Sequence, residues 1–283
     1  MPGLIKKEEF KDNCGFGLIA NINGVKSHKV IINSINALIS MTHRGGVGSD
    51  GKTGDGCGLL FDIDHKFFAD TVLKEQNIEI GEYFAIGQIF YYQDISKLLP
   101  KIKKILKSEN LVLAAYRKVP VDEKILGEIA HNCMPEIFQL FIKPIEKDFN
   151  QDVFETGLIQ ARKYIEEIYM DDNKLYVCSM SSKTVVYKGL MLPNAIKEFY
   201  LDLNKENFRA STCVFHQRFS TNTSPRWHLA QPFRLLAHNG EINAIRGNRN
   251  WVKARSSKFK TPLIPKIQKF KQLVNETGSD SSS

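Results

Sequence analysis

The chain has 283 residues, of which 42% are hydrophobic and 25% charged, a balance typical of a soluble globular protein long enough to bury a full core. Its longest apolar runs, such as Phe84–Tyr92, are much shorter than the roughly 18 residues of a membrane-spanning helix, so we expect no membrane partner. The net charge of +8 comes mostly from scattered lysines without a recognition motif, so we expect no nucleic-acid partner.

The number and spacing of the cysteines and histidines indicate whether the protein contains disulfides and whether it binds a metal. The five cysteines include no CxxC pair, which argues against a disulfide scaffold and against a zinc site. The histidines show no metal-ligand spacing either. We therefore expect no metal and a reducing, cytoplasmic setting.

The N-terminal part predicts a strand, a turn and a helix behind a short leader. The leader Met1–Asn13 is mostly polar and lacks the apolar centre of a secretory signal, so it is interpreted as a pro-segment or a tail. A strand is predicted over Cys14–Ile22 and a turn at Asn23-Gly24. Ser27 is the expected cap of a helix that ends at the basic and glycine residues 43–46, with apolar side chains at helical spacing: Ile31, Ile32, Ile35, Leu38 and Ile39.

A glycine-rich loop over Gly45–Gly58 leads into a predicted strand over Cys57–Ile63. The loop lacks the GxxxxGK[ST] order of a phosphate-binding loop, and no helix follows it immediately. We expect only that its backbone turns tightly or closely approaches another part of the chain. Cys57 is interpreted as a core residue, with the role of nucleophile as the alternative.

Helices and strands alternate from Asp64 to Leu203 and predict a single α+β domain of stacked sheets with flanking helices. Strands over Lys174–Met180 and Thr184–Leu190 are predicted to form a hairpin. The other expected elements of this region are a helix capped by Asp64 and ending near Gln76, strands over Glu82–Tyr92, Leu111–Tyr116 and Glu136–Ile142, and helices over Ile95–Ser108, Glu123–Asn132 and Val153–Tyr169.

The C-terminal third is dense in polar residues of catalytic type. A strand over Thr212–His216 runs into a polar stretch, and an apolar run over Phe233–Ala237 ends at the pair Asn239-Gly240. A basic helix is predicted over Ala244–Arg255. No stop signal follows it in the last residues, so we expect the chain to continue beyond Ser283.

Cys14 opens the first apolar run and is a candidate nucleophile. Removal of the thirteen residues before it would give Cys14 a free α-amino group. An α-amino group has a pKa of about 8, so part of it is unprotonated at neutral pH and can accept the thiol proton. Taken alone, Cys14 is more often explained as a buried thiol at the start of a strand, because cysteine is among the most buried residue types.

Three further places hold residues that could act on a substrate. Asn239-Gly240 could supply an amide side chain and a backbone N–H to a developing oxyanion, with a tight hairpin turn as the alternative. Arg218 could bind a carboxylate through two parallel hydrogen bonds, with an ion pair at the protein surface as the alternative. Asp280 could receive a substrate ammonium group, although a capping aspartate is the more frequent explanation.

Six short segments contain these candidates and their neighbours: Cys14–Gly17, Met41–Gly46, Gly51–Gly58, His216–Asn222, His238–Asn243 with Arg246–Trp251, and Glu276–Ser281. In this order, and spread over nearly the whole chain, they resemble the class II glutamine amidotransferase domain at the N-terminus of glutamate synthase large subunits. The long glycine loop and the run Arg-Gly-Asn-Arg-Asn-Trp favour glutamate synthase over other class II amidotransferases.

The resemblance implies an N-terminal-nucleophile fold, a four-layer αββα sandwich with two mainly antiparallel sheets. It also implies that residues 1–13 are removed and that residues 14–283 form an amidotransferase domain, incomplete at its C-terminal end. By this resemblance Cys14 is the nucleophile, with its own amino group as the base, and Arg44 orients it. Asn239 and Gly240 form the oxyanion hole. Arg218 binds the α-carboxylate of the substrate, and Asp280 binds its α-amino group.

The implied reaction is hydrolysis of L-glutamine to glutamate and ammonia through a γ-glutamyl thioester. In the full-length enzymes the ammonia passes to a downstream synthase domain with FMN and an iron-sulfur cluster, which reductively aminates 2-oxoglutarate. NADPH, NADH or ferredoxin supplies the electrons, and a small electron-donating subunit is a further expected partner. We expect no cofactor within these 283 residues. Two alternatives stay open: an amidotransferase that serves another acceptor, and a non-catalytic remnant that binds glutamine or a partner subunit.

Overall fold

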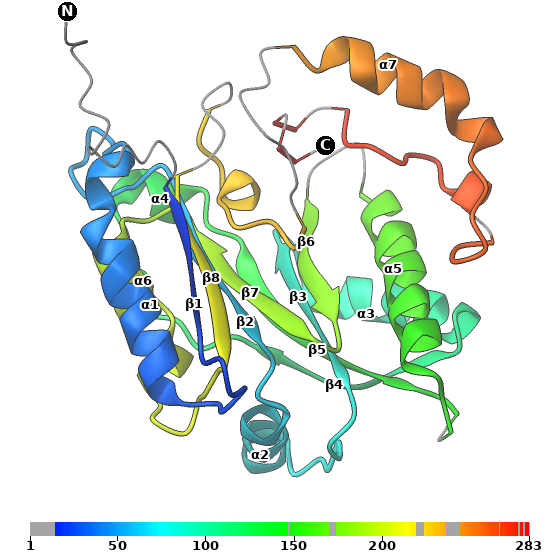
Figure 1. The fold of residues 1–283 in the computed structure, drawn as a ribbon, viewed down its shortest axis with the longest axis horizontal. Coiled ribbons are helices and arrows are strands. Elements are labelled where there is room, and N and C mark those ends of the chain that lie inside the picture. Colours follow the sequence, from blue (N-terminus) through cyan, green and yellow to red (C-terminus); the bar gives the residue numbers. More distant parts are fainter. Residues whose placement is uncertain are drawn as a thin grey trace, which may run out of the picture.

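Two four-stranded antiparallel sheets form the centre of the computed structural model, and helices lie at both sides of them (Figure 1). The structure describes residues 15–146, 148–169, 174–218, 224–235, 244–265, 267–276, 278–279 and 281–282. The predicted α+β fold class is confirmed. The two sheets and their helices are also consistent with the sandwich that the family resemblance implies.

The first sheet, called sheet 1, places the start of the described chain beside a strand that lies some two hundred residues later. Its strands follow the order β1 (Phe16–Ala20), β8 (Thr212–Gln217), β2 (Cys57–Asp62) and β7 (Thr184–Gly189). The register pairs Phe16 with His216 and Cys57 with Gln217. The beginning of β1, the end of β8 and the beginning of β2 therefore meet at one end of this sheet.

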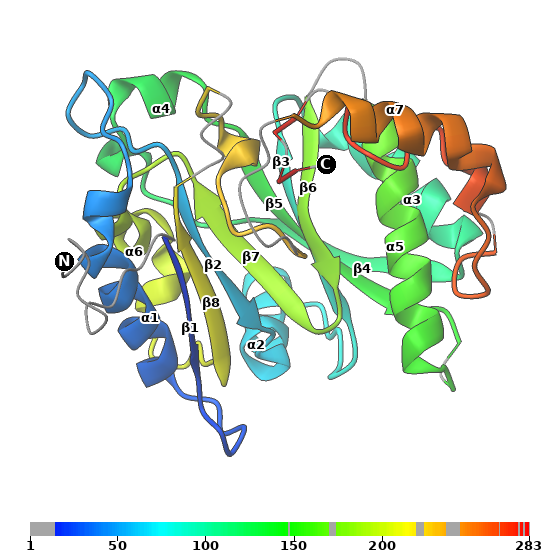
Figure 2. The same cartoon turned by 45° about the horizontal axis from the view of Figure 1, so that its top comes forward.

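The second sheet, called sheet 2, consists of consecutive strands from the middle of the chain. Their order is β4 (Leu111–Lys118), β5 (Glu136–Pro144), β3 (Ala85–Tyr91) and β6 (Leu175–Ser181). Helices α3 (Ile95–Ser108) and α5 (Gln151–Glu167) pack on one face through a cluster of buried apolar side chains that includes Leu98, Ile102 and Leu158. Both views show α3 and α5 at the opposite end of the molecule from α1 (Figure 2).

Helix α1 (His28–Ser40) buries Ile31, Ile35 and Leu38 in the core cluster that it shares with both sheets. Its N-terminus falls where the sequence predicts it, but the Ser27 side chain makes no capping hydrogen bond. The predicted end at residues 43–46 is wrong. The helix stops at Ser40, and residues 42–44 form a separate 3-10 turn that follows the backbone bond from Met41 N–H to the Leu38 carbonyl.

The predicted hairpin between the strands on either side of residues 182–183 is wrong, although both strands exist. Strand β6 pairs with β3 in sheet 2, and β7 pairs with β2 in sheet 1. The short connection therefore links the two sheets instead of closing a ladder within one of them. A direct contact remains between the two strands, because the Val186 N–H donates to the Ser179 hydroxyl at 3.2 Å.

The helix predicted over Glu123–Asn132 is split into a 3-10 turn at 123–125 and a short helix α4 (Glu128–Asn132). Gly127 lies at the break, where a Cβ atom would come within 2.4 Å of a carboxylate oxygen of Asp50. The remaining helices are α2 (His65–Gln76), whose cap is Asp64 as predicted, α6 (Ile196–Phe199), which the sequence did not predict, and α7 (Arg246–Arg255). Further 3-10 turns cover Pro193–Ala195, Leu201–Asn204, Trp227–Leu229, Ser256–Lys258 and Ile267–Lys269.

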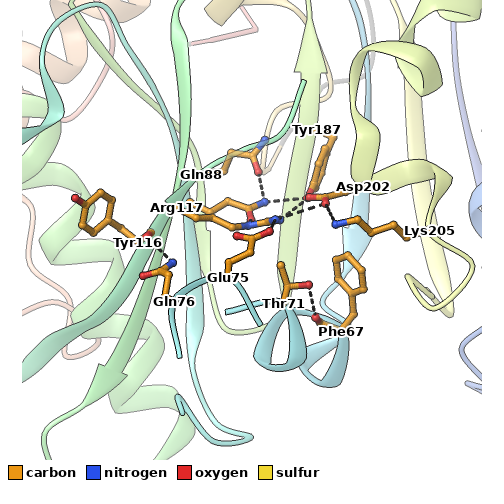
Figure 3. A network of polar contacts seen from close by, with 11 residues as sticks. Phe67, Thr71, Glu75, Gln76, Gln88, Tyr116, Arg117, Tyr187, Asp202 and Lys205 are labelled. Carbon is orange, nitrogen blue, oxygen red and sulfur yellow. Dashed lines mark hydrogen bonds and ion pairs between the residues drawn. The ribbon is translucent and has the colours of Figure 1, made fainter. Parts of the chain in front are cut away.

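A buried polar network connects the two sheets (Figure 3). Arg117 of β4 donates to Gln139 of β5 and forms an ion pair with Asp202. Asp202 also accepts a hydrogen bond from the Tyr187 hydroxyl of β7. Such a network is stabilising only when its members satisfy one another, so it specifies how the sheets stack. Among the described residues, no helix is long and apolar enough to cross a membrane.

Candidate functional site

The end of β8 and the start of β1 bring Gly15, the neighbour of Cys14, into contact with two other segments. The Gln217 N–H donates to the Gly15 carbonyl at 2.6 Å. A Cβ atom added to Gly15 would lie 3.6 Å from the Cβ of Arg44. Arg44 therefore borders the position where the chain enters β1. Cys14 itself lies outside the described residues.

Arg218 follows β8 directly and has an unusual backbone conformation. Its φ of 104° lies in the left-handed region, which is costly for a residue with a Cβ atom. Its backbone N–H donates to the Gly56 carbonyl at 2.7 Å, and this bond helps to hold the conformation. The side chain is half exposed, and its Nε lies 3.9 Å from Oδ2 of Asp55. The guanidinium is thus at the surface of the site and next to an acid.

The glycine-rich loop folds back on itself and is anchored to α4. Gly48 N–H bonds to the Thr53 carbonyl and Asp55 N–H to the Gly46 carbonyl, at 2.7 and 3.2 Å. The Asp50 carboxylate accepts hydrogen bonds from Thr53 and from the Ile129 N–H of α4. These bonds hold the pKa of Asp50 well below its usual range, and the bond from the Thr53 hydroxyl is the largest cause. The predicted tight turning of the loop is confirmed.

Gly45, Asp55 and Gln217 approach one another closely in the interior of the site. A Cβ atom on Gly45 would lie 2.0 Å from Nε2 of Gln217 and 2.8 Å from Oδ1 of Asp55, so any larger residue would displace these side chains. Gln217 is fully buried. Within the described part of the chain, neither amide atom of Gln217 nor Oδ1 of Asp55 has a hydrogen-bond partner. Burial raises the pKa of Asp55, while the Gly46 N–H and the Arg218 guanidinium act in the opposite direction.

Cys57 and His216 lie near this cluster but are held in uncharged forms. Cys57 is fully buried, and burial raises the pKa of its thiol far above the usual range, which confirms its interpretation as a core residue. His216 stacks on the Phe16 ring with 6.4 Å between centroids, and burial lowers the pKa of its imidazole to about 4. Neither side chain supplies a charge at neutral pH.

The structure brings together two of the residues that the sequence singled out, Arg44 and Arg218, at the end of sheet 1 where β1 begins. The other four, Cys14, Asn239, Gly240 and Asp280, lie outside the described residues. The segment before Asp280 is nevertheless fixed. Arg249 of α7 donates through Nη2 to the carbonyls of Gly278 and Ser279, at 2.7 and 3.2 Å.

Asp55, Gln217 and Arg249 were not assigned roles from the sequence. For Gln217 a signal existed, because alternation along β8 places it on the same face as the buried Phe215 and Cys213, and a buried amide needs an explanation. For Asp55 and Arg249 the neighbours are distant in the chain. In the described ranges, no three His, Cys, Asp or Glu side chains form a possible metal-binding group.

Comparison with known proteins places these residues in a family context. The family model for glutamine amidotransferases of class II matches residues 14–283. The chain is 38% identical over 99% of its length to glutamate synthase [NADH] of Saccharomyces cerevisiae. It is 39% identical over 95% to a ferredoxin-dependent glutamate synthase of Arabidopsis thaliana, and 38% identical over 98% to the glutamate synthase [NADPH] large chain of Azospirillum brasilense. It spans 14, 17 and 19% of these three relatives.

Proposed function

Because the chain belongs to the family of class II glutamine amidotransferases, we propose that it is the glutaminase part of a glutamate synthase. One observation carries this proposal: the family match begins at Cys14, and the neighbouring Gly15 lies against Arg44 and against Gln217, the residue before Arg218. The proposed reaction is hydrolysis of L-glutamine to glutamate and ammonia.

Cys14 is the proposed nucleophile, after residues 1–13 have been removed and residues 14–283 remain as part of the amidotransferase domain. Its thiol proton passes to its own α-amino group, and the thiolate attacks the carboxamide carbon of glutamine. The amino group then returns the proton to the departing nitrogen, which leaves as ammonia. A γ-glutamyl thioester remains on Cys14, and water hydrolyses it to glutamate.

The other site residues have proposed roles in binding and charge stabilisation. Asn239 and Gly240 donate hydrogen bonds to the oxyanion, which is usually among the largest contributions to such a reaction. Arg218 binds the α-carboxylate, Asp280 binds the α-amino group, and Arg44 orients the nucleophile. Support for Arg218 comes from its position at the end of β8, one residue beyond the bond that joins β8 to Gly15.

The ammonia is proposed to serve a synthase region that lies outside this chain. There FMN and an iron-sulfur cluster would support reductive amination of 2-oxoglutarate, with a small electron-donating subunit as a further partner. The three relatives are named for NADH, ferredoxin and NADPH at nearly equal identity, so we propose that the electron donor is determined by a region outside this chain. A cytoplasmic location is proposed because cysteine usage indicates a reducing compartment.

The test uses the protein as the cell makes it, glutamine labelled with ¹⁵N in its amide, unlabelled 2-oxoglutarate, and NADPH, NADH or reduced ferredoxin, each in a separate assay, as the source of electrons. Label should appear in a newly formed glutamate, with unlabelled glutamine plus ¹⁵N-ammonium as the control for the synthase step. Label that leaves only as free ammonium or enters another acceptor would contradict glutamate synthesis. Mass spectrometry should find a mature N-terminus at Cys14. A chain that still begins at Met1 would contradict the proposed nucleophile.

A further inference from the structure

The guanidinium of Arg218 needs a partner that fixes its direction. The backbone of Arg218 is held by the bond to Gly56, but the side chain is half exposed. An arginine side chain that is free to rotate loses rotamer entropy when it is fixed, and this loss weakens the binding of a carboxylate to it. Among the described residues, the acid that faces it is Asp55.

Asp55 is well suited to that task because it is itself immobile. Its backbone is bonded to Gly46, and a Cβ atom on Gly54 would lie 2.4 Å from the Met191 carbonyl, so this part of the loop lies directly against its neighbour. The Asp55 side chain is only 11% exposed. A carboxylate fixed in this way can determine the orientation of a longer and more mobile side chain.

The anchoring of the loop to α4 does not depend on Asp55. Asp50 anchors the loop to α4, and Oδ1 of Asp55 has no hydrogen-bond partner within the described part of the chain. A buried carboxylate oxygen without a partner costs stability, and such costs are concentrated at functional sites. The acid therefore requires an explanation other than the anchoring of the loop.

We propose that Asp55 is a positioning residue of the glutamine site, which holds the guanidinium of Arg218 from its Nε side so that the two terminal nitrogens face the α-carboxylate of the substrate. This inference rests on the proposed function, because Arg218 as the carboxylate ligand is part of it. The contact of 3.9 Å is long for an ion pair, and it shortens when the carboxylate binds on the opposite side of the guanidinium.

The test separates recognition of the α-carboxylate from reactivity of the thiol. In the protein as the cell makes it, Cys14 is labelled with 6-diazo-5-oxo-L-norleucine, which carries the α-carboxylate of glutamine, and separately with iodoacetamide, which does not. The Cys14 peptide is quantified by mass spectrometry, because the exposed Cys133 also reacts with iodoacetamide. Asp55→Asn keeps the size of the side chain and removes its charge.

We expect Asp55→Asn to slow labelling by the glutamine analogue at least about tenfold and to leave labelling by iodoacetamide within about twofold of wild type. The KM for glutamine should rise in the same variant. Asp70→Asn, at an exposed position on α2, is the matched control and should change neither rate. If both reagents slow together, or neither slows, Asp55 does not position Arg218.

A second variant approaches the same contact from the other side. Arg218→Lys keeps the positive charge at an exposed position but lacks the Nε that faces Asp55, so it should lose the same selectivity between the two reagents. Full selectivity in Arg218→Lys would overturn the proposal even if Asp55→Asn does not fold. Failure of the wild-type Cys14 to react with the glutamine analogue would instead count against the proposed glutaminase function.

Discussion

Arg117 of β4 and Asp202 form an ion pair with 2.5 Å between Nη2 and Oδ2, and the two side chains are 2% and 0% exposed. Burial alone would raise the pKa of Asp202, but Arg117 and then Lys205 outweigh it, so the pKa is lowered. The charged Asp202 therefore stabilises the fold at any pH above the pKa that Asp202 has in the unfolded chain. This stabilisation is lost as the pH falls through the lower pKa that Asp202 has in the folded protein.

We expect Asp202→Asn to lower the free energy of unfolding by about 3 kcal/mol at neutral pH, because Arg117 would stay buried without its main counter-charge. Urea denaturation measures the change. Lys118 is the neighbour of Arg117 on β4 and pairs with Glu136 in solvent, so Lys118→Gln is the matched control, with an expected cost below about 1 kcal/mol. An equal loss in the free energy of unfolding for the two variants would contradict the claim that the buried ion pair matters more than the exposed one.

Lys188 of β7 is a fully buried amine that donates to the His228 carbonyl at 2.9 Å. Burial lowers the pKa of this amine to about 7, whereas the unfolded chain keeps the ordinary value near 10.5. Between these values the unfolded state binds the extra proton, so stability rises with pH across this window. Lys188→Met should flatten that rise.

The measurement is the free energy of unfolding at about pH 7.5 and about pH 9.5, by urea denaturation, in the wild type and the variant. The absolute stability of Lys188→Met also reflects the lost bond to His228, so the difference between the two pH values is the quantity that decides. Lys183→Met, at an exposed position next to β7, is the control and should keep the wild-type slope. An unchanged slope in Lys188→Met would show that the amine stays protonated when buried.

Cys14 and Cys57 are the two cysteines that were considered as nucleophiles. Cys14→Ala should abolish glutamine hydrolysis and labelling by the glutamine analogue, because no other thiol is proposed to react. Cys57→Ala should keep the labelling and lose only stability, since its thiol is fully buried. Mass spectrometry of the labelled peptides checks both, and label on Cys57 in the Cys14 variant would reverse the assignment.

Gly45 and Gly46 are adjacent, but only the first lies against the buried cluster. In Gly45→Ala the new methyl group would meet Nε2 of Gln217 at 2.0 Å, so the buried Gln217 side chain or the loop itself must move. In Gly46→Ala the nearest atom is Oδ2 of Asp55 at 3.5 Å, an ordinary contact. We expect Gly45→Ala to lower kcat/KM for glutamine by more than about tenfold, and Gly46→Ala to have a much smaller effect.

Arg249 holds the backbone of Gly278 and Ser279, next to the expected ligand of the substrate amino group. Arg249→Met should raise the KM for glutamine several-fold, because the two carbonyl contacts that fix this segment are lost. Arg255 lies on the same helix and stacks on Trp251, so Arg255→Met is the control. If steady-state kinetics give the same KM for glutamine in both variants, Arg249 does not contribute to substrate binding.

The sequence predicts elements better than it predicts their partners. Helix α3 begins and ends at the predicted residues, because its apolar positions repeat with the helical period. The pairing of β7 was wrong because this strand is buried on both faces, so alternation does not show which sheet it joins. Arg44 and Arg218 could be named from local motifs. The role proposed for Asp55 depends on its contact with Arg218, a residue distant in the chain, which no local pattern records.

If residues 1–13 are removed as proposed, the order of strands in sheet 1 also determines when that removal can occur. All four strands of sheet 2 lie between residues 85 and 181, whereas β1, in the described chain, pairs with β8 alone. Contacts between distant residues form late because a long loop must close first. We therefore expect the leader to stay attached until the ribosome has released residue 217. A chain stopped after Gly189 should keep the leader up to Asn13, and N-terminal sequencing of that shortened chain checks the delay. Premature ammonia release from an unfinished polypeptide would thereby be prevented.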